Sequence, residues 1–316
     1  MSNQIDVVIV AYNRYDLTCS CLRHLRAQTL EHRVIVVDNG STDDTRVRLR
    51  SEWPAVHVEC FDENRSFPEA CNRGVGAGCG EIVVLLNNDI DCRPDFLEQL
   101  AAPLQDATVG SVASLVLQAD GQRIDGIGLT ADVTLSAFAR LRGLPPAQAG
   151  NAVPSLVGPG GGAAAYRRAA WEQVDGLDEA LLFYMEDFDL ALRLRIAGWR
   201  SVAEPNAVGV HLGSATLGHR SASQRRYGGF GRGYVLRRYG LLRGRSAPRT
   251  LGTEMIVVLA DLLISRDLAA LRGRIAGWRA GRARPRLVLP PGSIDQTIRF
   301  RDSLSRRWRM YSLRGA

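Results

Sequence analysis

Three acidic residues beside two aromatic residues form the cluster in this sequence best suited to proton transfer. Glu186, Asp187 and Asp189 stand in the run Phe-Tyr-Met-Glu-Asp-Phe-Asp-Leu, and apolar residues at helical spacing follow as far as Ala197. This spacing predicts a helix whose first turn carries the acids. Acids at a helix start can serve only as caps for the free backbone amides. A carboxylate beside aromatic side chains can instead act as a general base.

Polar side chains also follow three apolar, β-branched runs, at the points where strands should end. The runs 6–11, 33–38 and 81–86 lead into Tyr12-Asn13-Arg14, Asp38-Asn39 and Asn87-Asn88-Asp89. Helical stretches separate the runs, which predicts a mostly parallel, doubly wound α/β sheet. Ligands of such sheets bind beyond the carboxyl ends of the strands, where these side chains would converge. Asn and Asp that only form loops would give the same pattern.

Oxygen ligands at the third strand end suit a divalent cation. Asp89 follows the most apolar strand, and carboxylates hold Mg²⁺ or Mn²⁺ that also bind substrate phosphates, so a nucleotide diphosphate is the predicted ligand. His211 ends a later strand-like run and is either structural or a further metal or phosphate ligand. The glycine run 158–162 lacks the Lys-Ser/Thr of a phosphate loop. We interpret it as a plain turn or as a place where backbone approaches the ligand closely.

The charge of the chain divides it into two parts. Lysine is absent, so all 40 basic residues are arginine. Residues 1–216 hold 18 arginines against 28 acidic residues, a net charge of −10, whereas residues 217–316 hold 22 against 5, a net charge of +17. Such a basic region suits anionic lipid, nucleic acid or the acidic part of the same chain. The stretch 271–286, with Trp278 among arginines, is typical of a helix on a membrane surface, and a helical appendage packed on the acidic part is the alternative.

Composition bounds the class of protein further. The apolar fraction of 46% is typical of a globular chain, and no apolar run approaches the roughly 20 residues of a membrane span. The polar start at residues 1–6 leads directly into a strand-like run, so we expect no signal peptide and a cytoplasmic location. The six cysteines include no Cys-x-x-Cys pair, which predicts reduced thiols and no structural metal.

The ordered motifs of residues 6–213 resemble those of family 2 glycosyltransferases with the GT-A fold, and within that family the bacterial rhamnosyltransferase-like branch. The matching motifs are Val-Ile-Val-Ala-Tyr-Asn-Arg14, Val-Val-Asp-Asn-Gly-Ser41, Asn72-Arg73-Gly74, Leu-Leu-Asn-Asn-Asp89, Arg167-Arg168, Gly176-Leu-Asp-Glu179, Tyr184-Met-Glu-Asp187 and Val-Gly-Val-His211. Ala11 stands where the family usually has Thr or Ser. The metal motif is Asn-Asn-Asp89 in place of Asp-x-Asp.

The resemblance implies a catalytic domain at 1–216, with a nucleotide-sugar half (1–91) and an acceptor and catalytic half (92–216), followed by an arginine-rich helical extension (217–316). Asp38 would accept a hydrogen bond from the pyrimidine base. The other donor-binding residues implied are Ala11, Tyr12, Asn13, Asn72, Asn88 and Asp89. Asp89 and His211 would hold Mg²⁺ or Mn²⁺ on the diphosphate, with Asp91 as a further candidate.

On the acceptor side, the resemblance implies that Asp187 takes the proton of the acceptor hydroxyl while the anomeric carbon inverts, with Glu186 as the reserve base. Asp189 would be a structural acid at the helix start. We therefore expect an inverting glycosyltransferase that uses a metal ion and dTDP-rhamnose. Its acceptor would be a glycan or a lipid-linked molecule at the inner face of the plasma membrane.

Three other functions fit parts of the sequence. A nucleic-acid-binding protein would use the basic region, although the acidic first part argues against it. A nucleotidyltransferase would need a basic, glycine-rich loop after the first strand, where this chain has Ala-Tyr-Asn-Arg14. A glycosyltransferase-like scaffold without activity would keep the fold and lack turnover.

Overall fold

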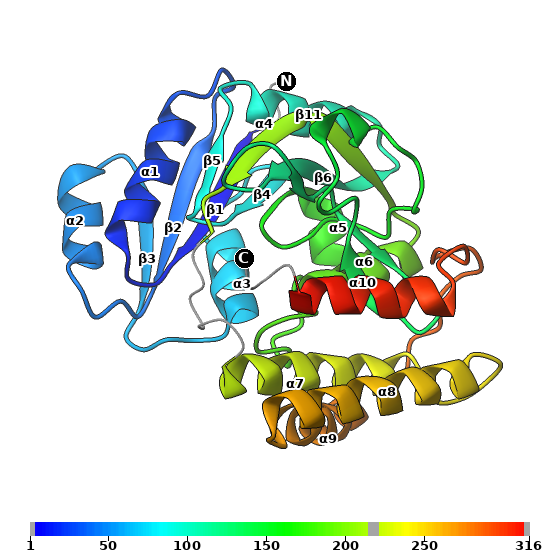
Figure 1. Ribbon diagram of the computed structural model, residues 1–316. Coiled ribbons are helices and arrows are strands. Elements are labelled where there is room, and N and C mark those ends of the chain that lie inside the picture. Colours follow the sequence, from blue (N-terminus) through cyan, green and yellow to red (C-terminus); the bar gives the residue numbers. More distant parts are fainter. Residues whose placement is uncertain (1–3, 214–220, 313–316) are drawn as a thin grey trace.

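A nine-stranded mixed sheet forms the centre of the computed structural model, which describes residues 4–213 and 221–312 (Figure 1). Its strand order is β3-β2-β1-β4-β10-β6-β11-β5, with β7 beside β6, and β8 and β9 pair separately. The strands are β1 (Ile5–Ala11), β2 (Arg33–Asn39), β3 (His57–Phe61), β4 (Ile82–Leu86), β5 (Ile90–Cys92), β6 (Val109–Leu117), β7 (Ile124–Gly126), β8 (Leu129–Ala131), β9 (Ala137–Ala139), β10 (Ala163–Arg167) and β11 (Arg200–His211).

The strands run parallel in the first half of the sheet and in mixed directions in the second half. Strands β3, β2, β1 and β4 are parallel, so their carboxyl ends lie at one edge. Strand β10 then lies antiparallel between β4 and β6, and β11 is parallel to β6 but antiparallel to β5. The predicted α/β fold is confirmed. The sequence did not indicate the antiparallel position of β10.

Helices cover both faces of the sheet because its central strands are apolar on both sides. Val7 and Ile9 of β1 belong to the core cluster that contains side chains of α1 and α4, whereas Val8 belongs to the cluster that contains those of α3 and α6. The helices of this part are α1 (Tyr15–Arg26), α2 (Thr45–Glu52), α3 (Phe67–Gly76), α4 (Phe96–Ala101), α5 (Arg168–Gln173) and α6 (Glu186–Ile196), with the short 3₁₀ helices η1 (Ala102–Gln105) and η2 (Pro146–Gln148). Fully buried β-branched strands of this kind are typical of a sheet between two helix layers.

Four further helices form a C-terminal extension that lies beside α6 (Figure 1). They are α7 (Ala222–Arg238), α8 (Ala247–Ser265), α9 (Ala269–Ala280) and α10 (Phe300–Ser312), with the 3₁₀ helix η3 (Gly281–Ala283) after α9. Helices α7 and α9 pack very closely through glycines. A Cβ atom on Gly277 would lie 1.9 Å from the carbonyl oxygen of Phe230. The close approach of these backbones therefore requires glycine.

Buried polar contacts attach this extension to the rest of the chain. Arg232 of α7 donates hydrogen bonds of 2.8 Å to the carbonyl oxygens of Thr134 and Leu135, and Arg238 donates one of 2.6 Å to Asp178. The basic and acidic parts of the chain therefore meet each other, as the appendage alternative predicted. The predicted boundary between residues 216 and 217 lies outside the described residues, and the division into domains stays a prediction.

Trp278 does not have the orientation expected of a membrane anchor. Its side chain is partly buried against a core cluster that includes Val235, and the guanidinium of Arg237 lies 5.1 Å from its ring centroid. That stretch 271–286 lies on a membrane surface stays a prediction, but Trp278 itself packs against the protein. Across the described ranges, no helix combines the length and the apolar character needed to cross a bilayer.

Candidate active site

The carboxyl ends of β1 and β2 bring several of the predicted donor-binding residues together. Ala11 lies opposite Asp38 in the strand register, and both residues are fully buried. The side-chain oxygen of Asn13 accepts a hydrogen bond of 2.8 Å from the backbone of Thr42, and the backbone of Asn13 donates one of 2.8 Å to the hydroxyl of Ser41. The loops after the two strands are therefore tied into one surface.

Asp38 is held firmly within this surface. Its Oδ2 atom accepts a hydrogen bond of 2.6 Å from Nε of Arg46, and its Oδ1 atom accepts one of 3.1 Å from the backbone of Ser41. Arg46 also donates to the carbonyl oxygen of Phe61, at the end of β3. A nucleotide base bound to Asp38 would therefore share the carboxylate of Asp38 with the guanidinium of Arg46. Tyr12 is half-buried at the same edge.

Two of the predicted donor contacts are used to hold structural elements together. The side-chain amide of Asn72 on α3 donates a hydrogen bond of 2.9 Å to the carbonyl oxygen of Leu177. It also accepts one of 3.0 Å from the backbone N–H of Leu177. This brace joins α3 to the segment before α6. Asn88 donates a hydrogen bond of 3.0 Å to the hydroxyl of Thr18 on α1.

Asp89 and His211 meet at the carboxyl ends of β4 and β11. Antiparallel pairing of β11 with β5 sets His211 opposite Ile90, and its Nε2 atom lies 3.1 Å from Oδ2 of Asp89. Two donor atoms at this separation fit neighbouring positions around an octahedral cation with ligand distances of about 2.1 Å. In residues 4–213 and 221–312, no group of three His, Cys, Asp or Glu side chains is arranged to hold a cation. The pair therefore suits a cation that takes its other ligands from donor phosphates and water.

Asp125 of β7 supports this pair, although the sequence gave no signal for it. Its Oδ2 atom lies 3.2 Å from Nδ1 of His211, and its Oδ1 atom lies 2.9 Å from Arg142. Hydrogen bonds to Asp125 and Asp89 raise the pKa of His211 to about 10. A carboxylate on Nδ1 orients the imidazole so that Nε2 faces the cation position. Asp125 lies in the stretch 121–143, which shows no periodicity from which its role could be predicted.

Asp91, the further candidate for the cation, has contacts on helix α1. Its carboxylate accepts a hydrogen bond of 3.0 Å from the hydroxyl of Ser20 and lies 3.2 Å from Nδ1 of His24. These contacts connect β5 to α1.

Glu186 and Asp187 occupy the first turn of α6, beside the glycine run. The backbone N–H of Gly161 donates a hydrogen bond of 2.9 Å to Oδ2 of Asp187, and that of Phe188 donates one of 2.7 Å to Oδ1. Among the described residues, the enclosed Oε2 atom of Glu186 has no hydrogen-bond partner. Burial raises the pKa of Asp187. Burial and the neighbouring charge of Asp187 raise the pKa of Glu186 to about 8.

A short backbone path joins the Asp89–His211 pair to these two acids. The N–H of Asn87, two residues before Asp89, donates a hydrogen bond of 2.8 Å to the carbonyl oxygen of Gly162. The preceding residue, Gly161, is the one that donates to Asp187. The glycine run therefore lies between the candidate cation site and the acids, and its close approach to a ligand stays a prediction.

Asp189, in the same turn, faces away from this group into the core. It is fully buried and accepts hydrogen bonds of 2.6 Å from Arg193 and 2.8 Å from the hydroxyl of Tyr239 in the extension. These contacts match the structural role predicted for it, and they fix the start of α6 against α7.

The turn that leads into α6 has an uncommon backbone. Tyr184 and Met185 both have positive φ angles, of 68° and 75°, which residues with a side chain rarely adopt. Helix α7 packs on this turn through Gly231, since a Cβ atom there would lie 2.6 Å from the carbonyl oxygen of Tyr184. Backbone held in such a conformation is typical of functional sites whose surroundings enforce it.

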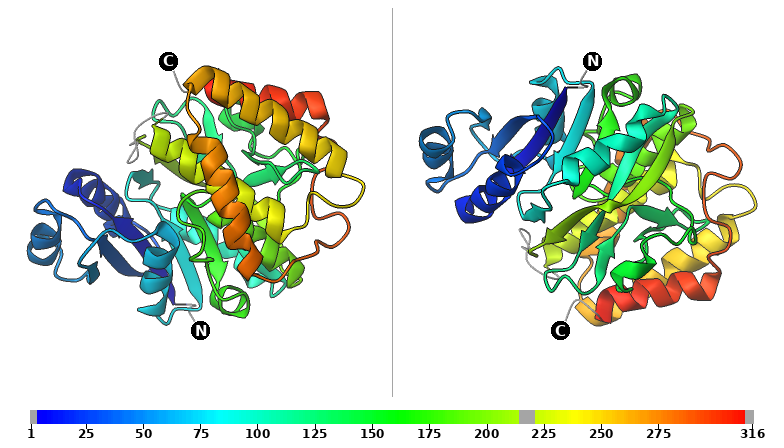
Figure 2. Two further views of the ribbon diagram at one scale, coloured as in Figure 1. Left: turned by 90° about the horizontal axis from the view of Figure 1, so that it is seen from below. Right: turned by 90° about the horizontal axis from the view of Figure 1, so that it is seen from above.

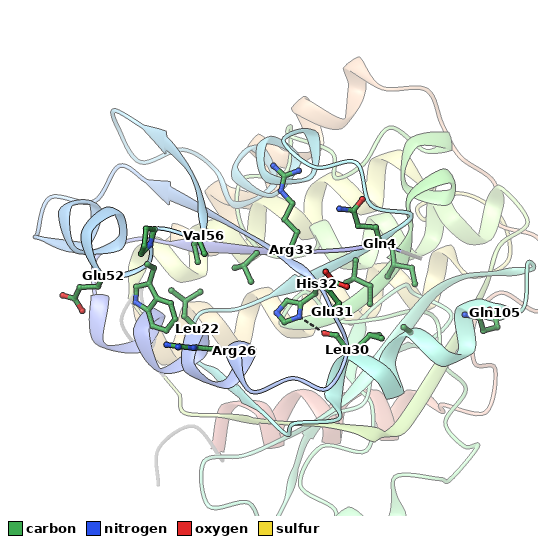
Figure 3. Close-up of a pocket in the computed structure, with 17 residues that line it drawn as sticks. Gln4, Leu22, Arg26, Leu30, Glu31, His32, Arg33, Glu52, Val56 and Gln105 are labelled. Atoms are coloured by element: carbon green, nitrogen blue, oxygen red, sulfur yellow. Dashed lines mark hydrogen bonds between the residues drawn. The ribbon is translucent and has the colours of Figure 1, made fainter. Parts of the chain in front are cut away.

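A cavity of about 1100 Å³ lies at the opposite edge of the sheet (Figure 3). Its lining includes Gln4, Arg33 and Ile82, which stand at or just before the amino ends of β1, β2 and β4. The predicted site is at the carboxyl ends, so this cavity is not part of it.

The fold and the site define a glycosyltransferase with the GT-A fold. The structure is similar to the mannosyltransferase PcManGT from Pyrobaculum calidifontis in complex with GDP-Man and Mn²⁺, with a TM-score of 0.52 and 19% identity over 90% of this chain and 76% of that chain. It is also similar to GalNAc-T7 with UDP, GalNAc and Mn²⁺, with a TM-score of 0.58 and 14% identity over 80% of this chain and 54% of that chain.

The sequence assigns the family. The model of glycosyl transferase family 2 matches residues 6–174, more than half of the chain, and the protein belongs to this family. It is 27% identical over 229 residues to an N-acetylglucosaminyl-diphospho-decaprenol L-rhamnosyltransferase of Mycobacterium tuberculosis, which covers 60% of this chain and 69% of the relative. It is also 27% identical over 282 residues to an N-acetylglucosaminyltransferase of Mesorhizobium japonicum, covering 84% of this chain and 65% of the relative. The predicted family and enzyme class are confirmed.

We expect Glu186→Gln to change how stability depends on pH. The folded pKa of about 8 exceeds the ordinary value of 4.5, so the native state keeps a proton that the unfolded chain releases. The free energy of unfolding of the wild type should therefore fall as pH rises from about 4.5 to about 8. Glutamine does not titrate. The free energy of unfolding of the variant should therefore rise relative to that of the wild type by up to about 1.4 kcal/mol per pH unit in this window. Urea unfolding across the window measures the gain. A difference that stays constant with pH would contradict a protonated Glu186.

A second prediction concerns the turn before α6. Gly231→Ala should displace Tyr184 and Met185, and with them the acids of α6, because the new methyl group has no room. We expect kcat to fall by about tenfold or more while KM for the donor changes little, since misplaced catalytic groups cost turnover. Gly228→Ala on the same helix is the matched control, because a Cβ atom there meets open space. Equal kcat values for the two variants would show that α7 does not position the acids.

Proposed function

We propose that this glycosyltransferase transfers rhamnose from dTDP-rhamnose to a hydroxyl group of a glycan or lipid-linked acceptor, with inversion and with Mg²⁺ or Mn²⁺ bound. The observation that carries the proposal is the backbone path from Asp89 through Asn87 and Gly162 to Asp187. It sets a pair of cation ligands beside a pair of buried acids. The rhamnosyltransferase of M. tuberculosis supports the sugar, and the Mn²⁺ in the complexes of PcManGT and GalNAc-T7 supports the cation.

On the donor side, the residues of the first strand ends bind the nucleotide. Asp38 accepts a hydrogen bond from the base, with Ala11, Tyr12 and Asn13 on the same surface. Asn72 and Asn88 support this surface through their braces to Leu177 and Thr18. Asp89 and His211 would hold the cation, and its positive charge would supply electrostatic stabilisation to a departing nucleoside diphosphate.

On the acceptor side, Asp187 acts as the general base. It takes the proton of the acceptor hydroxyl as that oxygen bonds to the anomeric carbon and the bond from this carbon to the diphosphate breaks. Attack opposite the leaving group inverts the carbon. Burial and the neighbouring charge of Asp187 raise the pKa of Glu186 to about 8, so Glu186 holds its proton more tightly than an ordinary carboxyl group does. Glu186 is therefore the reserve base.

The proposed place of action is the cytoplasmic face of the plasma membrane. The acceptor named for the relative from M. tuberculosis is a decaprenol diphosphate, a lipid that carries its sugar at a membrane surface. A chain that acts on such an acceptor must reach the surface of the bilayer.

The test compares Asp187→Asn with Asp89→Asn. Asparagine keeps the shape of Asp187 but takes no proton, so transfer should fall by about 10³-fold while dTDP-rhamnose with Mn²⁺ still raises the Tm. Asp89→Asn should instead lose the part of that Tm increase that depends on Mn²⁺. Near-normal turnover by Asp187→Asn would exclude Asp187 as the base. If no nucleotide-sugar raises the Tm of the wild type in Mn²⁺, the proposed function is wrong.

A further inference from the structure

The outward face of helix α8 is apolar along almost its whole length. Six exposed side chains form what we call the α8 stripe: Leu251, Met255, Ile256, Leu259, Leu262 and Leu263. Met255 and Leu263 expose 63% and 77% of their surface. Large apolar patches on a protein surface mark sites of interaction with another protein or with a membrane.

The polar side of α8 is used within the protein. Glu254 lies between Arg232 of α7 and Arg274 of α9, at 2.7 Å and 3.0 Å. Burial raises the pKa of Glu254, but the two guanidinium groups outweigh burial and lower it to about 2. Asp261, the other acid of α8, is also buried. The orientation of the helix is therefore fixed, and the stripe faces outward. Figure 2 shows α8 and α9 on the outer side of α7 in the view from below.

Exposed arginines flank α8 along the chain and occur on the next helix, α9. Arg243 and Arg245 are exposed before the start of α8, and Arg266 is exposed at its end. Exposed Arg272 and Arg279 lie on one face of α9. Two apolar residues of that face, Leu268 and Ile275, are exposed with them. In residues 221–308, exposed arginine occurs at eleven positions and exposed acid only at Asp302.

We propose that the α8 stripe docks on the surface of an anionic lipid bilayer. The apolar side chains enter the boundary between headgroups and acyl chains, and the flanking arginines contact lipid phosphates. Charge distinguishes this occupant from a second copy of the chain. Two stripes packed face to face would bring arginines of both copies together without acids to pair them, which is unfavourable. A bilayer that contains anionic lipid supplies the complementary charge.

The docked orientation connects the bilayer to the catalytic acids. Helix α7 packs against α9 through glycines on one side and against the turn at Tyr184 through Gly231 on the other. A lipid-linked acceptor would thus be held by the same bilayer that fixes α8 and α9. This consequence rests on the proposed function, whereas the docking itself does not.

The test is cosedimentation of the full chain with vesicles of phosphatidylcholine, with and without phosphatidylglycerol. The wild type should bind the vesicles that contain phosphatidylglycerol, and added salt should weaken the binding. In the double variant Met255→Gln, Leu259→Gln, the affinity for these vesicles should fall by about tenfold or more, because polar amides replace apolar side chains of the stripe. Both side chains are exposed, so the fold should persist, which the Tm verifies. Val47→Gln on α2, which replaces a valine that is 69% exposed away from the stripe, is the matched control.

Three outcomes would overturn the proposal. The first is equal binding by the wild type and the double variant, and the second is equal binding to both kinds of vesicle. The third is a wild-type dimer that the double variant dissociates, without vesicle binding, which would make a second copy the occupant. Binding is measured without donor or acceptor. A failure here is therefore distinct from a failure of dTDP-rhamnose and Mn²⁺ to raise the Tm.

Discussion

The burial of two adjacent carboxylates at the start of α6 is the constraint on which the rest of the site depends. Burial raises the pKa of both Glu186 and Asp187, so the fold must hold them against a cost in stability. Asp189 in the same turn stabilises the start of the helix. It accepts hydrogen bonds from Arg193 of α6 and from the hydroxyl of Tyr239 in the extension. The C-terminal extension thus helps to fix the helix that carries the proposed catalytic acids.

The change of strand direction at β10 explains how two sets of residues come to share one site. The parallel strands β1, β2 and β4 present the proposed donor-binding residues at their carboxyl ends. Antiparallel β10 then begins at that same edge, which sets Gly162 beside Asn87. Antiparallel pairing of β11 with β5 brings His211 to Asp89 in the same way. The contacts of Gly162 with Asn87 and of His211 with Asp89 therefore both depend on an antiparallel pair.

The sequence was enough to predict the alternating sheet, the strand-end residues and the acids of α6, because each has a local pattern or a place in a motif. It could not predict Asp125, whose contact with His211 arises from the pairing of β7 with β6. A place for Asn72 along the nucleotide stays a prediction, and the sequence gave no sign that its amide also binds Leu177. Trp278 shows the same limit, since an amphipathic pattern does not say which face a neighbouring helix covers. Such contacts come from distant segments and have no signature in spacing.

The measurement that tests the account most directly is the pH dependence of kcat/KM for sugar transfer, which reports the acid–base groups of the free enzyme. The buried pair of acids must release a proton before Asp187 can act as a base. We therefore predict that kcat/KM rises with pH, by up to about tenfold per pH unit, until it levels off at an apparent pKa. This apparent pKa should lie well above the ordinary carboxyl range. The Asp187→Asn variant should lose both the activity and this rise of kcat/KM with pH. A kcat/KM that stays flat down to the pH at which exposed carboxyl groups titrate would contradict a buried, catalytic acid pair.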